Sequence, residues 1–187
     1  TALRISGSEG YTYKTNNVHV VNNIFRGWID PLTGGTHTGG GTRYTAVLVE
    51  LGPNTATDQA MEYAIFEDNR VEDGETLMKF GDWEHVIVRR NVFRTASGYG
   101  GAARLHLGHP YEHRPLKDIR IVDNDIISNE NRSGHTGVFS LFRYGGPIYN
   151  GMNRHQEIYF QNNRVLMAGG STRLIYLTNQ PGQLEEL

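Results

Sequence analysis

Five segments of the chain repeat one pattern around an asparagine. They are VHVVNNIF, AIFEDNRV, VIVRRNVF, IRIVDNDI and IYFQNNRV, aligned on Asn23, Asn69, Asn91, Asn124 and Asn163. In every segment the residues five and three places before the asparagine, and two places after it, are apolar. A strand with a two-residue period that bends at the asparagine requires this register. The pattern therefore predicts one type of strand, repeated along the whole chain.

A second set of short strands alternates with the first. AVLVELG, TLMKFG, ARLHLG and SLFRYG end at Gly52, Gly81, Gly108 and Gly145, and RLIYLT has Thr178 in the glycine position. Aligned on that position, the expected inward residues are Val49, Met78, Leu105, Phe142 and Ile175, followed by Leu51, Phe80, Leu107, Tyr144 and Leu177. LRISG, at residues 3–7, matches an incomplete sixth copy.

The spacing between the aligned asparagines selects among the all-β folds. The intervals are 46, 22, 33 and 39 residues, which is too irregular for the blades of a propeller. A parallel β-helix, or solenoid, tolerates them because its turns accept insertions while its strands match from coil to coil. We therefore expect an all-β, single-stranded parallel β-helix of about five coils. Like residues then stack roughly 4.8 Å apart, and the asparagines form a ladder.

The size and composition of the chain fit a single domain. The chain has 187 residues, 37% of them hydrophobic, and no apolar run of membrane-spanning length. Its formal charge of -2 predicts neither nucleic acid nor a membrane as partner. The absence of cysteine excludes disulfides and thiolate metal sites. The stretch 27–44, rich in Gly and Thr, predicts an inserted loop that projects from one coil.

The repeat resembles the right-handed parallel β-helix superfamily that includes the pectate lyases, and the resemblance covers nearly the whole chain. It implies a right-handed coil. It does not imply one chemistry, because lyases, hydrolases, phage tailspikes and non-catalytic adhesins share this fold. Any function has to come from the outward rows of residues.

One outward row of the second strand type is polar or ionisable throughout. It holds the residues two places before the terminal glycine, which are Glu50, Lys79, His106, Arg143 and Tyr176. A solvated sheet face with alternating charges explains such a row without any function. The functional interpretation is that Lys79, Arg104, His106 and Arg143 form a cationic strip for an acidic polysaccharide.

A cationic strip suits β-elimination of a uronate polymer. The reaction removes a proton α to a carboxylate, so it needs a group that neutralises the carboxylate, a base, and a proton donor for the leaving oxygen. A lysine beside other cations can have a lowered pKa and act as the base. Arg104 or Arg143 would hold the carboxylate, and His106 would act as acid or base.

MKFGDWEHVIVRRNVFR followed by ARLHLGH resembles the chondroitinase B and alginate lyase family. The resemblance implies that Lys79 is the base, that an arginine is catalytic, and that acidic residues before the lysine bind calcium. Glu72, Asp73 and Glu75 are the candidate ligands, and carboxylate oxygens suit this hard cation. A solvated acidic turn is the alternative for these three residues. The sequence departs from the family where His106 occupies the arginine position, which leaves Arg104 or Arg143 for that role.

Further residues are candidates for contact with sugar rings or hydroxyl groups. They are Glu50, Trp83, His109, Tyr111, Tyr144 and Tyr176. Aromatic rings can stack on a sugar, although single exposed aromatics are normal on any protein surface.

Two functions from different classes remain open at this point. The first is a polysaccharide lyase with an acidic polysaccharide as partner, which the resemblance places outside the cell or in the periplasm. The second is a non-catalytic module that binds carbohydrate or builds a tailspike, adhesin or filament. No capping helix is evident at either end, so end-to-end self-association or a flanking domain is also expected. A glycoside hydrolase is disfavoured because the outward row holds a single acid, Glu50.

Overall fold

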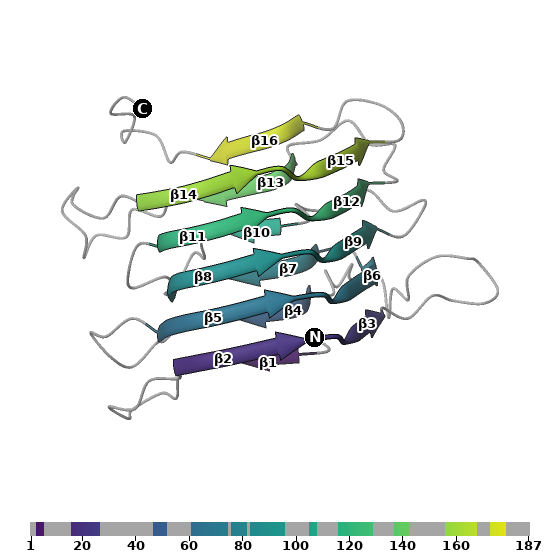
Figure 1. Ribbon diagram of the computed structural model, residues 1–187. Coiled ribbons are helices and arrows are strands. Elements are labelled where there is room, and N and C mark those ends of the chain that lie inside the picture. Colours follow the sequence, from purple (N-terminus) through teal and green to yellow (C-terminus); the bar gives the residue numbers. More distant parts are fainter. Residues whose placement is uncertain are drawn as a thin grey trace, which may run out of the picture.

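The computed structural model describes residues 3–5, 16–26, 47–51, 61–74, 76–81, 83–95, 105–107, 116–128, 137–142, 156–167 and 173–178. These residues form sixteen β-strands, β1 to β16, and contain no helix. Each strand pairs in parallel with the strand three places further along the chain, so three sheets result. The strands stack in sequence order, from purple to yellow in Figure 1. For these residues, the prediction of an all-β fold with parallel strands is confirmed.

Sheet A contains the second strand type and has the order β1-β4-β7-β10-β13-β16. Its strands are β1 (Leu3–Ile5), β4 (Val47–Leu51), β7 (Thr76–Phe80), β10 (Leu105–Leu107), β13 (Gly137–Phe142) and β16 (Arg173–Thr178). The first strand, β1, pairs in parallel with β4, so Leu3–Ile5 of the predicted sixth copy form a strand of this sheet.

Each asparagine-centred segment is divided between sheets B and C, which lie in front of sheet A in Figure 1. Sheet B contains β2 (Asn16–Val21), β5 (Met61–Glu67), β8 (Trp83–Arg89), β11 (Lys117–Val122) and β14 (Gln156–Gln161). Sheet C contains β3 (Ile24–Arg26), β6 (Arg70–Gly74), β9 (Val92–Thr95), β12 (Asp125–Ser128) and β15 (Arg164–Met167). The bend predicted at each asparagine separates the two strands.

The three apolar positions of the repeat pair directly between neighbouring strands, as the alignment predicts. The rows are Val18, Ala64, Val86, Ile119 and Ile158; Val20, Phe66, Val88, Ile121 and Phe160; and Phe25, Val71, Phe93, Ile126 and Val165. The nine members in the three middle segments are buried, and the six in the first and last segments are partly buried. These rows form the core of the molecule.

The aligned asparagines form the expected ladder. The side-chain oxygen of each asparagine from Asn69 onward accepts a hydrogen bond from the backbone amide of the preceding one, over 2.9 to 3.0 Å. The side-chain amide of Asn91 also donates to the carbonyl of Phe66 and to the side chain of Asn124. Since buried polar groups need partners, this network explains how Asn69, Asn91 and Asn124 can be buried.

Two residues in each asparagine-centred segment have a left-handed backbone. One stands directly before the ladder asparagine, with φ between 52° and 56°: Asn22, Asp68, Arg90, Asp123 and Asn162. The other stands six places before it, with φ between 49° and 62°: Asn17, Tyr63, His85, Asp118 and Glu157. A left-handed residue interrupts the alternation of side chains along a strand. Inward-facing residues on its two sides are therefore separated by an odd number of places, which is a change of parity.

That change of parity explains a buried row that the sequence pattern does not reveal. Met61, Trp83 and Leu116 stand eight places before their ladder asparagines and are fully buried. An uninterrupted two-residue period would assign these positions to the outer face. The left-handed residue two places later returns them to the core.

Candidate functional site

The predicted catalytic row lies on sheet A, and the backbone places its central residues side by side. Lys79 of β7 pairs with Glu50 of β4 on one side and with His106 of β10 on the other. Neighbouring strands are about 4.8 Å apart, so these three backbone positions fall within the length of a short oligosaccharide. The register also adds Arg4 of β1, opposite Glu50, to this row.

The fourth member of the row differs from the prediction. Ser140 of β13, and not Arg143, pairs with His106, and Tyr176 of β16 pairs with Ser140. The inward position opposite Leu105 is correspondingly filled by Phe139, so the assignment of Phe142 to that position is wrong.

The error has a simple physical cause. Gly145 corresponds in sequence to the glycines that follow the preceding copies, which predicts a strand end there. In the structure β13 runs from Gly137 to Phe142, and Phe142 pairs with Thr178, the residue in the glycine position of the last copy. The apolar residues therefore set a register three places earlier than the alignment on Gly145 predicts.

Six predicted site residues lie outside the described residues: Glu75, Arg104, His109, Tyr111, Arg143 and Tyr144. For Glu50, Asp73, Lys79, His106 and Tyr176 the structure describes the backbone position in a strand. The cationic strip and its catalytic roles thus stay predictions.

Trp83 is not a sugar platform. It is fully buried in the core and pairs with Met61 in the neighbouring strand. Its indole Nε1 has no hydrogen-bond partner among the described residues. Its placement on the surface was wrong because the left-handed backbone at His85 turns Trp83 inward.

Glu72, a predicted calcium ligand, is buried in strand β6 and not in a solvated turn. Its Oε1 accepts a hydrogen bond from Arg26 over 2.7 Å, and its Oε2 lies 3.0 Å from Arg70 Nε. Burial alone would raise the pKa of this carboxyl, but the two guanidinium groups outweigh it and lower the pKa. A calcium ion would have to displace both arginines, so Glu72 does not fit the calcium site. No group of three metal-binding side chains occurs among the described residues.

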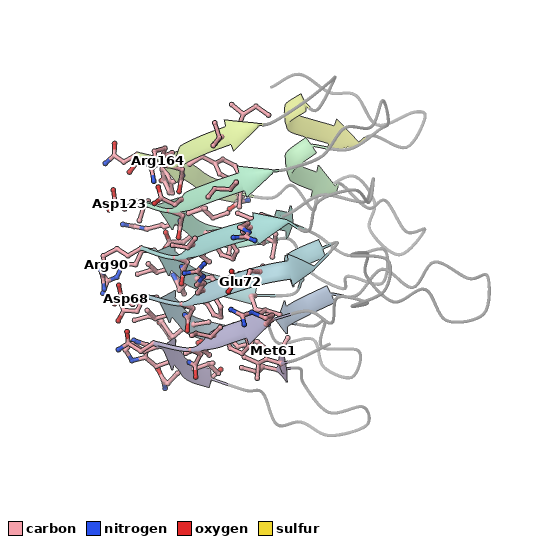
Figure 2. All side chains as sticks on the ribbon, turned by 90° about the vertical axis from the view of Figure 1, so that its right-hand side faces the viewer. Met61, Asp68, Glu72, Arg90, Asp123 and Arg164 are labelled. Atoms are coloured by element: carbon pink, nitrogen blue, oxygen red, sulfur yellow. The ribbon has the colours of Figure 1, made fainter. Side chains whose placement is uncertain are left out.

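A first ion-pair cluster, missed in the sequence, surrounds Glu67 beside the ladder. Glu67 accepts hydrogen bonds from Arg89, Arg90 and His19 over 2.6 to 2.8 Å. These bonds, the one from Arg89 foremost, lower the pKa of Glu67 to about 2. Arg90 also bonds both oxygens of Asp68, and these two side chains project together from one edge of the molecule in Figure 2.

A second cluster on the outer face of sheet B combines rings with a charged pair. The rings of Tyr63 and His85 stack with centroids 4.9 Å apart. His85 Nδ1 lies 3.0 Å from Asp118 Oδ2, and Arg120 Nε donates to the other oxygen of Asp118. The Arg120 guanidinium in turn lies 5.6 Å from the ring centre of Tyr159. Five side chains from four neighbouring strands therefore form one continuous surface, which we call the tyrosine–histidine patch.

Both clusters could have been read from the aligned segments. Glu67 and Arg89 stand two places before their asparagines, and Tyr63 and His85 stand six places before theirs. Residues at equal distance from the asparagine become neighbours once strands pair in register. The polar positions of the repeat therefore carry this signal, in addition to the apolar positions that mark the core.

Comparison of the chain with protein-family models found no match. Comparisons with curated proteins and with solved structures likewise found none. Within the described residues, no helix has the length and apolar character needed to cross a membrane.

Proposed function

We propose that the three sheets are the faces of a right-handed single-stranded parallel β-helix that binds and cleaves an acidic polysaccharide. The pairing of every strand with the third one after it supports the coil. The asparagine ladder supports it too, since such ladders form where identical residues stack in register. Strand-to-strand crossovers in parallel sheets are right-handed in nearly all proteins, which supports the hand.

The observation that carries the proposed activity is the pairing of Lys79 with His106 on neighbouring strands of sheet A. Met78 and Leu105, the residues before them, are buried. Because residues alternate along a strand, Lys79 and His106 belong to the opposite, outer face. Two basic residues about 4.8 Å apart suit one negatively charged sugar.

In the proposed reaction Lys79 Nζ takes the proton from the carbon α to the uronate carboxylate. The electron pair left on that carbon forms a double bond to the neighbouring carbon, and the bond from that neighbour to the glycosidic oxygen breaks. His106 returns a proton to the leaving oxygen. Arg104, directly before β10 in the sequence, neutralises the carboxylate while charge accumulates on it. No step uses calcium, and a polymer of this kind places the protein outside the cell or in the periplasm.

The test is incubation of the protein with alginate, pectate, chondroitin sulfate and dermatan sulfate, followed by ultraviolet absorbance of an unsaturated sugar end. The proposal predicts such absorbance with at least one of the four polymers. Binding without any product would instead favour the non-catalytic module. Neither binding nor product with all four would contradict the proposed substrate class.

A further inference from the structure

We propose that the tyrosine–histidine patch on sheet B is a second saccharide site, selective for an uncharged glycan. It is separate from the row on sheet A, because its residues come from β5, β8, β11 and β14, which all belong to sheet B. Binding at this patch does not depend on any lyase activity of sheet A.

The backbone gives the first argument. Tyr63 has φ 62°, in a region that favours glycine and, after it, asparagine, aspartate and histidine. Asn17, His85 and Asp118 follow this preference at the same position of the repeat, whereas Tyr63 and Glu157 do not. A bulky aromatic ring held in an unfavourable backbone conformation on a surface points to a function for Tyr63 other than stability.

The exposure of the rings gives the second argument. Tyr63 is 50% exposed and Tyr159 is 39% exposed, although most large apolar side chains of the middle strands are buried. They lie on strands separated by three strand spacings, roughly 14 Å. Exposed aromatic rings at that separation offer two platforms for the apolar faces of sugar rings in one short oligosaccharide.

Polar atoms between the two rings supply the third argument. The Asp118 carboxylate lies 3.0 Å from His85 Nδ1 and accepts a hydrogen bond from Arg120 Nε. These two partners lower the pKa of Asp118, and His85 has the larger effect. This arrangement orients His85 while Nε2 has no partner among the described residues. Sugar hydroxyl groups need fixed donors and acceptors of this kind, placed beside an aromatic surface.

The charge of the surroundings selects an uncharged ligand. Glu62 and Glu84 pair in neighbouring strands next to the rings, Lys117 pairs with Glu84 on its other side, and Glu157 follows Asp118 in the row of left-handed residues. Together with Asp118 and Arg120, which form an ion pair, these residues are four carboxylates and two cations, a formal charge of -2. A net negative surface disfavours a polyanion, whereas a neutral glycan does not meet that repulsion.

The experiment is a titration of the isotope-labelled chain with cellohexaose, mannohexaose and xylohexaose, followed by amide chemical shifts. We expect at least one of the three to shift residues of β5, β8, β11 and β14. Tyr63→Ala combined with Tyr159→Ala should weaken the binding at least tenfold. Ile24→Ala, which removes an exposed apolar side chain from sheet C, is the control and should leave the affinity unchanged.

His85→Phe separates the polar contribution from the platform, because it keeps a ring beside Tyr63 but removes the hydrogen bond to Asp118. It should weaken binding while the other amide shifts show an intact fold. The proposal is overturned if none of the three hexasaccharides binds, if the double tyrosine variant keeps its affinity, or if a hexameric alginate binds this patch as tightly. Lys79→Ala should leave the neutral-glycan affinity unchanged, so a failure of the lyase proposal is distinguishable from a failure here.

Discussion

The side-chain oxygen of Asn124 accepts a hydrogen bond of 3.0 Å from the backbone amide of Asn91, which stands 33 residues earlier in the chain. The same oxygen accepts a second bond from the Asn91 side chain, also at 3.0 Å. One amide group thus joins two successive segments at their bends. Repetition of this relationship from Asn23 to Asn163 links all five segments along one edge of the core.

Replacing a central asparagine should destabilise the fold strongly. Asn91→Ala leaves the buried amide of Asn69 without its acceptor and removes the donor to Phe66, so we expect a loss of about 3 kcal/mol in the free energy of unfolding. Asn23→Ala is the matched control at the exposed end of the ladder and should cost less than about 1 kcal/mol. Equal losses in urea denaturation would show that the ladder does not stabilise the core.

Trp83 should behave as a core residue. Trp83→Ala removes a fully buried side chain and should cost about 3 to 5 kcal/mol in the free energy of unfolding. Leu174→Ala, at a side chain that is 46% exposed, should stay below about 1 kcal/mol. A small loss for Trp83→Ala, measured in the same denaturation assay, would contradict the burial of Trp83 in the core.

The stability of the chain should fall on acidification because of Glu67. Its folded-state pKa of about 2 lies below its ordinary value of 4.5, so its stabilising contribution is complete above 4.5 and is lost as the pH falls toward 2. Glu67→Gln removes this carboxylate and should flatten the dependence of unfolding free energy on pH in that window. Parallel pH curves for the two proteins would contradict the assignment.

The buried ion pairs of Glu72 should contribute more to the free energy of unfolding than the exposed pair of Asp125 and Arg164. Glu72 is buried, so Glu72→Ala should cost about 1 to 3 kcal/mol, with water replacing part of the interaction at the half-exposed Arg26 and Arg70. Asp125→Ala breaks the exposed pair with Arg164 and should cost less than about 1 kcal/mol. Thermal unfolding of both variants measures the difference, and the reverse order would contradict the structure.

The sequence predicts the parallel strands, the three apolar rows and the ladder because a single residue, the asparagine, marks the register of each segment. It predicts the register of β13 incorrectly because alignment on Gly145 is offset by three places, whereas apolar pairing sets the register through Phe139. Trp83 is misplaced because a left-handed residue at His85 reverses the alternation of the strand, and no local pattern marks His85 as left-handed.

The candidate site is less accessible to sequence reasoning. The Lys79 and His106 pairing follows from the alignment, because both strands end at a glycine at the same distance. The partners of Glu67, Glu72 and Asp118 depend on which polar positions face each other after the sheets form. Such pairs become visible when each polar position is compared across all five segments, since charge complementarity is then read row by row.

The most direct test of the proposed function compares two lysine variants in the absorbance assay. Lys79→Ala should lower the rate of unsaturated-product formation by about 100-fold or more, because general-base catalysis contributes at least that much. Lys117→Ala removes a lysine from sheet B and should leave the rate unchanged. Equal rates for Lys79→Ala and the unaltered chain, or equal losses in both variants, would contradict a catalytic role for Lys79.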